Sequence, residues 1–172
     1  METLYTALLV FVFAMSALTW WGTSKKATKY GRYLRQGQKH TVPSRIGWLA
    51  FESPQLVAFA ATFLWSTRSV PSAGAAALVL FAIWQGHYTY RALIYPLLRR
   101  DASKRFPMGG IVAGLCFNSV NGFLNGYAVA HAAHLGADWL ADPRFIVGCM
   151  IFVGGWLTNV HSDLVLIRLR SS

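Results

Sequence analysis

The sequence is poor in acidic residues and in charge altogether. Only 6 of its 172 residues are Asp or Glu, and 13% are charged, where a typical soluble domain has about a quarter. It also has only two cysteines, Cys116 and Cys149, both in apolar stretches and without metal-ligand spacing. This excludes a disulfide scaffold and a zinc site, and we expect both cysteines to be small core residues.

The sequence is instead rich in hydrophobic residues, which make up 55% of it and occur in long stretches. Five stretches approach the roughly 20 apolar residues that a helix needs to cross a bilayer. They are Thr3–Trp21, Ile46–Trp65, Val70–Tyr90, Gly110–Ala130 and Phe145–Val160. The sequence therefore predicts an all-α integral membrane protein, a single domain over 1–172 with five transmembrane helices. The first stretch lacks a basic leading region and a clear cleavage site, so we expect a membrane helix rather than a signal peptide.

The basic residues predict an orientation in the membrane. Sixteen Lys and Arg give a net charge of +10, and they alternate between connections. Seven follow the first stretch, and the next connections and the tail hold one, five, one and two. By the positive-inside rule, the N-terminus lies outside and the C-terminal end of the chain is cytoplasmic. Orientation and contact with anionic lipid account for most of these cations without nucleic acid.

Glu52 is the one charged residue within the five stretches. Ionisable residues inside a span are costly and usually face an interior cavity, so each is a functional candidate. It lies two residues before Pro54, which loosens the local backbone hydrogen bonding. Burial favours a protonated carboxyl that can donate a hydrogen bond. The alternative is a packing glutamate paired with a cytoplasmic arginine.

A polar and aromatic cluster ends the third stretch. Trp84, Tyr88, Arg91 and Tyr95 follow helical spacing on one face. An interfacial aromatic belt would explain the same residues without chemistry.

Two more polar patterns follow. Asn118, Asn121 and Asn125 form an amide stripe in a segment that also carries two Gly-xxx-Gly pairs, typical of close helix packing. His131 and His134 follow on the external side, where we expect interfacial side chains and no metal role.

The fifth stretch leads into a third polar pattern, in which Asn159, Asp163 and Arg170 share a helical face. Amide, carboxylate and guanidinium together can hold a nucleotide, and an N-cap or ion pair at a membrane boundary is the alternative. The predicted orientation gathers the candidates in or beside the cytoplasmic half, which favours a lipid-accessible pocket open to a soluble cofactor. These candidates are Glu52, Tyr88, Arg91, Asn159, Asp163 and Arg170.

These residues resemble, in order along the whole chain, the steroid 5α-reductase (3-oxo-5α-steroid 4-dehydrogenase) family, in a bacterial-type form. The matching motifs are Tyr30-Gly31, Pro43-x-Arg45-x-x-Trp48-x-x-x-Glu52-x-Pro54, His87-Tyr88-x-x-Arg91, Asn121-Gly122-x-x-x-Gly126-Tyr127, Asp142-x-Arg144-Phe145, and Asn159-x-His161-Ser162-Asp163 followed by Leu169-Arg170.

The resemblance implies a multi-pass membrane enzyme, in the inner or cell membrane if bacterial, with its active site facing the cytoplasm. It would use NADPH to reduce the Δ4 double bond of a 3-oxo-steroid. In the family, the residues matching Glu52 and Tyr88 hydrogen-bond the 3-oxo group. Hydride delivered to C5 of an enone pushes negative charge onto the C3 oxygen, and two donors stabilise that enolate before C4 is protonated.

The resemblance also implies binding residues. Asn159, Asp163 and Arg170 match family residues at the NADPH, and Arg100 and Arg105 are expected at its phosphates. Asn121 and Phe117 are expected in the substrate cavity. No metal, no nucleic acid and a monomer are expected, with a steroid or other enone lipid and membrane lipid as partners.

The family fold has seven transmembrane helices, and the segment after the fifth helix completes the nucleotide site. We therefore expect this chain to be the N-terminal portion of that fold, without its C-terminal part, and activity to belong to the complete protein. Related alternatives are an enoyl-lipid or polyprenol reductase and an isoprenylcysteine-type methyltransferase. A small transporter with Glu52 as its proton-coupling site is an alternative of another class.

Overall fold

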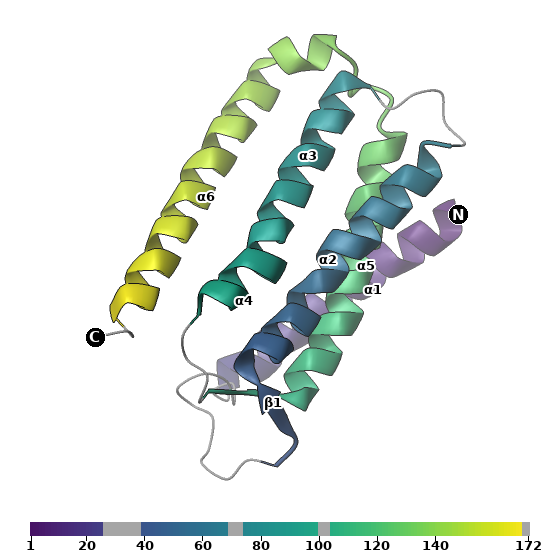
Figure 1. Ribbon diagram of the computed structural model, residues 1–172. Helices are drawn as coiled ribbons and strands as arrows, with labels where there is room; N and C mark the ends of the chain where they lie inside the picture. The colour runs from purple at the N-terminus through teal and green to yellow at the C-terminus, as the bar shows by residue number, and fades with distance from the viewer. Residues whose placement is uncertain (26–38, 69–73, 100–103, 170–172) are drawn as a thin grey trace.

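The computed structural model describes residues 1–25, 39–68, 74–99 and 104–169 of the chain. Tyr30-Gly31, Arg100 and Arg170 from the sequence predictions lie outside the described residues. Long helices run up and down beside one another (Figure 1). They are α1 (Glu2–Lys25), α2 (Ser44–Ser66), α3 (Ala75–Thr89), α5 (Met108–His131) and α6 (Pro143–Leu169).

Each of the five apolar stretches forms a helix, but two helices continue further than predicted. The third passes Tyr90 through a π-helical turn, η2 (Tyr90–Ile94), and ends as α4 (Tyr95–Leu98). The fifth runs to Leu169 instead of ending at Val160. Helical hydrogen bonds do not require apolar side chains, so polar residues end an apolar stretch without ending its helix. Of the described helices, α1 and α6 are long and apolar enough to cross a membrane.

A short antiparallel ribbon ties two connections together at one end of the helices. Its strands are β1 (Thr41–Pro43) and β2 (Arg105–Pro107), with Val42 opposite Phe106. The Arg105 guanidinium donates to the Thr41 carbonyl at 2.7 Å. The ribbon leads directly into α2 and α5, so it fixes where these two helices start relative to each other.

The closest helix pair is α2 with α5, and small residues make the approach possible. A Cβ atom added to Gly126 would lie 2.7 Å from the Phe59 carbonyl oxygen, and one added to Gly122 would lie 3.1 Å from the Phe59 nitrogen. The amide stripe faces the same seam, where the Gln55 amide donates to Asn118 at 3.0 Å. The predicted role of glycines and amides in helix packing is confirmed.

Aromatic rings fill the other side of α2, toward α3. Phe59 and Phe63 are fully buried. The Trp84 ring stacks on Phe59 with centroids 4.5 Å apart, and Phe81 packs on Phe63 at 4.7 Å. The Trp84 indole also donates to the Gln55 carbonyl at 3.1 Å. Helix α3 is therefore held to α2 by rings and by hydrogen bonds to the α2 backbone.

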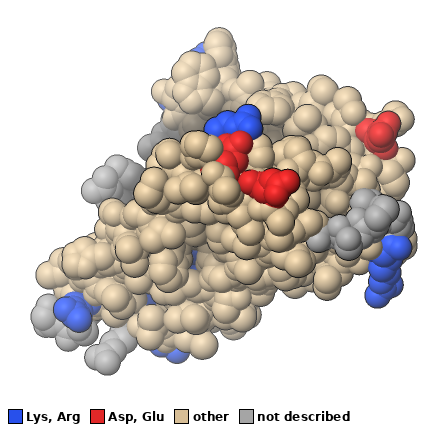
Figure 2. Space-filling model, turned by 90° about the horizontal axis from the view of Figure 1, so that it is seen from above, with Lys and Arg blue, Asp and Glu red and all other residues tan. Residues whose placement is uncertain are grey.

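Helix α6 starts with a charged cap that follows the short 3-10 helix η3 (Asp138–Ala141). The Asp142 carboxylate accepts the Arg144 backbone N–H at 2.8 Å and its guanidinium at 2.8 and 2.9 Å. Pro143 occupies the first helical position, as expected behind an N-cap. The Arg144 guanidinium beside Asp142 lowers the pKa of that carboxyl to about 2. Seen from this end, the surface has few charges and a basic group directly beside acidic ones (Figure 2).

We expect Gly126→Ala to destabilise the protein by about 1–3 kcal/mol, the scale of overpacking a tight contact. The added methyl group meets a backbone carbonyl, which has no side-chain freedom to move away. Thermal unfolding in detergent measures the effect. Gly148→Ala is the matched control, because no atom lies within 4 Å of a Cβ built there; equal melting temperatures for the two variants would contradict the close packing.

Acid is expected to weaken the cap of α6. The folded pKa of Asp142 is depressed to about 2, so its stabilising effect is complete above the ordinary carboxyl pKa near 4 and is lost as the pH falls toward 2. Asp142→Asn keeps a capping side chain but loses the charge. Melting curves from pH 5 to pH 2 should therefore fall less steeply for this variant than for the unsubstituted protein, and parallel curves would contradict the prediction.

Candidate functional site

The centre of the site is one arginine shared between two buried carboxylates. The Arg91 guanidinium lies 3.2 Å from Glu52 Oε1 and 3.5 Å from Asp163 Oδ2. Both acidic residues are buried, at 8% and 7% exposure. The three side chains come from α2, η2 and α6, so the cluster joins three helices. Of the two sequence interpretations of Glu52, the geometry shows the glutamate paired with an arginine.

The local backbone and two rings fix the position of Arg91. The π-helical turn holds one more residue per turn than an α-helix, and such turns occur often at functional sites. The Arg91 carbonyl accepts the Trp48 indole N–H at 3.1 Å. Its guanidinium lies over the Trp48 and Tyr95 rings, 5.0 and 5.2 Å from their centroids. Cation–π contacts of this kind stabilise a charge that is removed from water.

Tyr88 lies near the end of α3, three residues before Arg91. Its ring contacts Trp84 and His87, with centroids 5.0 and 4.9 Å apart. Tyr88 lines a cavity of about 390 Å³, which we call the α3–α6 cavity. The lining residues are Phe59, Leu80, Ile83, Trp84, His87, Tyr88, Asn125, Val129 and Phe152. The structure thus places Tyr88 at an apolar space, three residues before the arginine that pairs with Glu52.

The residues predicted for a nucleotide are only partly brought together. Asp163 is the one buried residue on α6, and Tyr90 donates to it at 3.5 Å. Asn159, one turn earlier, is exposed. Arg105 is exposed and bonded to Thr41 in the ribbon. Asp163 therefore belongs to the Arg91 cluster, whereas Asn159 and Arg105 are exposed and lie outside it.

The two residues predicted for the substrate cavity lie elsewhere. The Asn121 amide donates to Gln55 at 3.3 Å, within the α2–α5 seam. Phe117 lines a cleft of about 670 Å³ between α1 and α5, to which Phe51 and Trp20 also contribute. We call this the α1–α5 cleft. Neither residue lines the α3–α6 cavity that contains Tyr88.

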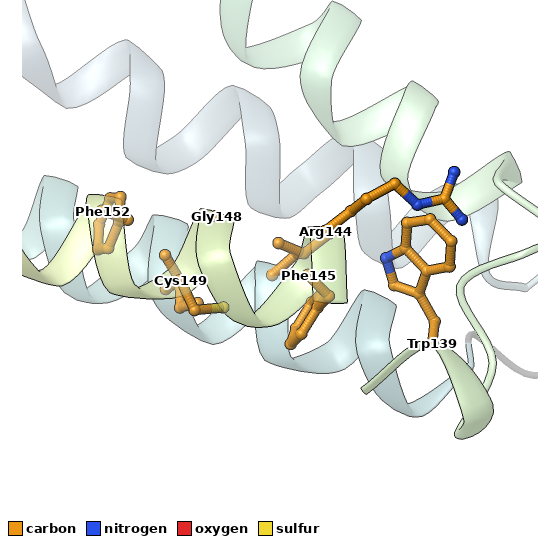
Figure 3. A pocket seen from close by; sticks show the side chains of 8 residues that line it. Trp139, Arg144, Phe145, Gly148, Cys149 and Phe152 are labelled. Atoms are coloured by element: carbon orange, nitrogen blue, oxygen red, sulfur yellow. The ribbon is translucent and has the colours of Figure 1, made fainter. Parts of the chain in front are cut away.

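The prediction that both cysteines are core residues is wrong. Cys116 is exposed and lines the α1–α5 cleft, and Cys149 is half-buried. Cys149 lines a groove of about 270 Å³ between α3 and the start of α6, together with Trp139, Arg144 and Phe152 (Figure 3). Apolar side chains in a membrane helix can face lipid or an interhelical space as well as a core, which the sequence pattern did not distinguish.

Sequence reasoning missed the partners that complete the cluster. Arg91 was grouped with the polar residues of the third stretch, but its two carboxylate partners were not identified. Trp48, Tyr90 and Trp156 were not singled out as parts of a site. A signal did exist, since Glu52 lies within the second predicted span and Arg91 and Asp163 follow the predicted cytoplasmic ends of the third and fifth, where burial requires opposite charges to pair.

The fold and the site define a helical protein with an ion-paired carboxylate and a tyrosine beside an apolar cavity. Residues 104–172 match the family model described as 3-oxo-5-alpha-steroid 4-dehydrogenase. The chain is 31% identical over 98% of its length to human 3-oxo-5-alpha-steroid 4-dehydrogenase 1, and 34% identical over 82% to the type 2 protein of Sus scrofa. The chain belongs to the 3-oxo-5-alpha-steroid 4-dehydrogenase family.

The relatives are longer than this chain. It spans 64% of the human protein and 55% of the Sus scrofa protein. The match to the human protein extends over nearly all of the present residues, so the family resemblance is not confined to one helix or motif. The α2, α3 and α6 residues that meet at Arg91 all lie within it.

Arg91→Gln is expected to lower the free energy of unfolding by about 3–5 kcal/mol, the cost of leaving a buried charge without its partner. The loss should be partly recovered in the triple variant that also carries Glu52→Gln and Asp163→Asn, because no uncompensated carboxylate then remains. Thermal unfolding checks both. Arg68→Gln, at an exposed arginine, is the control, and an effect of Arg91→Gln no larger than that control would contradict a shared buried ion pair.

Proposed function

We propose that the complete protein reduces the Δ4 double bond of 3-oxo-Δ4-steroids with NADPH. The observation that carries the proposal is the position of Tyr88 in the α3–α6 cavity, three residues before the arginine that pairs with Glu52, in a chain of this family. The relatives' names describe this class of reaction. A cavity of this size falls within the range of small-molecule sites, and its lining is mostly apolar with a few polar groups, as a steroid requires.

Two donors in this chain serve the reaction at the C3 oxygen. Hydride addition at C5 moves negative charge onto that oxygen, and the Tyr88 hydroxyl and the Glu52 carboxyl donate hydrogen bonds to it. Hydrogen bonds that strengthen as charge develops lower the barrier, and one such donor is worth about 10²–10³ in rate. The Arg91 guanidinium next to them adds a positive charge on the same side.

The donor role requires the protonated form of Glu52, whereas the carboxylate is paired with Arg91. Arg91 is also within 3.5 Å of Asp163. A small shift of the guanidinium toward Asp163 frees Glu52 to take a proton and to donate to the ketone, and the guanidinium stays paired throughout. Arg91 is thus a positioning residue for Glu52.

The described residues fit the nicotinamide end of NADPH better than its phosphates. NADPH supplies the hydride when it is bound. Asp163 and Asn159 on α6 offer acceptor and amide groups, and buried polar atoms without partners lie between α3 and α6. For the phosphates we propose Arg105, Arg100 and Arg170, of which the structure describes only Arg105, in its ribbon contact with Thr41.

We assign the remaining predicted binding residues to supporting roles. Asn121 supports the wall between α2 and α5 through Gln55. Phe117 lines the α1–α5 cleft, a lateral route by which an apolar molecule can reach the helices from lipid. All five helical segments cross the bilayer in this proposal, with the ribbon end and the Arg91 cluster toward the cytoplasm, and the protein acts as a monomer.

The test is NADPH oxidation by detergent-purified protein with testosterone or progesterone, using this chain and the full reading frame that contains it. Glu52→Gln is expected to fold normally and to lower kcat by about 10²–10³, as is Tyr88→Phe. Tyr127→Phe removes a hydroxyl from a ring that packs on Tyr5 of α1 and does not line the α3–α6 cavity; it is the matched control and should retain activity.

The outcomes separate the parts of the proposal. Unchanged turnover in Glu52→Gln removes this residue from the mechanism. NADPH binding without steroid turnover in either form of the protein contradicts the steroid as substrate and directs the search to other enone lipids. A protein that binds neither NADPH nor steroid contradicts the proposed function as a whole.

A further inference from the structure

Two ring nitrogens between α3 and α6 are buried without a hydrogen-bond partner among the described residues. They are His87 Nδ1 on α3 and Trp156 Nε1 on α6. The His87 ring contacts Phe152 of α6, with centroids 5.9 Å apart, and Trp156 contacts Tyr90 at 6.1 Å. Phe152 and Trp156 are about one helical turn apart on α6. His87 and Tyr90 are likewise about one turn apart along α3 and its continuation. Both nitrogens therefore lie in one seam between α3 and α6, and His87 also lines the α3–α6 cavity.

Polar atoms in this situation call for a partner. An unpaired buried N–H group costs about 1–3 kcal/mol, and water is scarce between apolar helices within a membrane. Neighbouring side chains in the seam are rings, which accept hydrogen bonds poorly. Other ring and amide donors of α2 and α3 do have partners, since Trp48, Trp84 and Gln85 donate to backbone carbonyls. His87 Nδ1 and Trp156 Nε1 have no such partner among the described residues, which points to a bound ligand.

The chemistry of the two nitrogens defines the group that fits. An indole N–H is a donor only, and a neutral imidazole nitrogen without a proton is an acceptor. A ligand that satisfies both must offer an acceptor to Trp156 and a donor to His87. A primary carboxamide does so with its carbonyl oxygen and its NH₂ group, and an alcohol does so with a single hydroxyl.

The position of the seam decides between a carboxamide and a hydroxyl as the bound group. His87 is adjacent to Tyr88, the residue proposed to hold the C3 oxygen, so the seam lies next to the reacting end of the substrate. A hydroxyl at the far end of a steroid would lie away from it, toward the outer part of the cavity. The ring that donates hydride must come within about 3–3.5 Å of C5, two ring atoms from C3.

We infer that His87 and Trp156 bind the carboxamide of the nicotinamide ring, with the Trp156 N–H donating to its oxygen and its NH₂ group donating to His87 Nδ1. The inference rests on the proposed function and adds two residues to it. They position the ring face toward Tyr88 and Glu52. Because Trp156 donates to one half of the carboxamide and His87 accepts from the other, the pair fixes which way the ring is turned.

The test measures binding instead of turnover, by NADP⁺ titration of the full-length protein with isothermal calorimetry. Trp156→Phe keeps an aromatic ring and removes only the N–H, and His87→Phe keeps the contact with Phe152. Each should raise the Kd for NADP⁺ about 2- to 10-fold, the effect of one hydrogen bond, with the Kd for steroid unchanged. Trp139→Phe and His134→Phe, at the outer end of the helices, are the matched controls and should leave the Kd for NADP⁺ unchanged.

An analogue separates the two contacts. In 3-acetylpyridine adenine dinucleotide phosphate the NH₂ group is replaced by methyl. His87→Phe should therefore weaken NADP⁺ but not the analogue, whereas Trp156→Phe should weaken both. Equal losses for both ligands in His87→Phe would overturn the assignment of the NH₂ group to His87.

Two other results would overturn the inference in distinguishable ways. If the variants leave NADP⁺ binding unchanged but reduce the preference for testosterone over androstenedione, which has a ketone in place of the 17-hydroxyl, the seam binds a steroid hydroxyl. If the unsubstituted protein binds no NADP⁺, the proposed function fails and the assignment fails with it. NADP⁺ binding that the variants do not alter, with steroid preference unchanged, overturns the inference alone.

Discussion

The arrangement of this protein depends on one shared charge. Glu52 and Asp163 are buried carboxylates on helices far apart in the sequence, and the Arg91 guanidinium lies within 3.5 Å of both. Carboxylates in so poor a solvent must pair or take up a proton. Because Asp163 is the only buried residue of α6, its pairing determines where α6 lies beside α3. The same contact sets the surroundings of Glu52, so the charge that joins the helices also controls the proposed donor.

The close packing of α2 against α5 supports this ion-paired cluster. The glycines and amides between α2 and α5 bring the two backbones together, so that the α1–α5 cleft and the α3–α6 cavity lie on opposite sides of one helix pair. Glu52 is on α2 and therefore on one of the two closely packed helices. Arg91 and Asp163 come from η2 and α6, and α6 packs on α3 through rings and a single buried carboxylate. The site thus joins the closely packed helix pair to α6 through the Arg91 side chain.

The sequence predicted the helices well, because a long apolar stretch has few alternatives to a helix in a membrane. It also singled out Glu52, Tyr88 and Asp163 as candidates, since charged and hydroxyl groups are conspicuous in apolar stretches. It did not predict the π-helical turn at Tyr90–Ile94, which contains Arg91. Nor did it predict that Arg91 pairs with two carboxylates. Nor did it separate Phe117 from the Tyr88 cavity, since helical periodicity gives the face of a residue but not the neighbouring helix.

The two unpaired nitrogens lie between α3 and α6 because the side chains of α3 that face α2 and those that face α6 have different partners. Along α3, two polar side chains that face α2 donate to its backbone carbonyls: the Trp84 indole donates to Gln55, and the Gln85 amide donates to Leu56. Toward α6, regular helical bonds occupy the backbone carbonyls, so His87 and Trp156 have none to use. One face of α3 is therefore saturated with hydrogen bonds and serves structure, while the other retains hydrogen-bonding capacity beside Tyr88, where a bound molecule can use it.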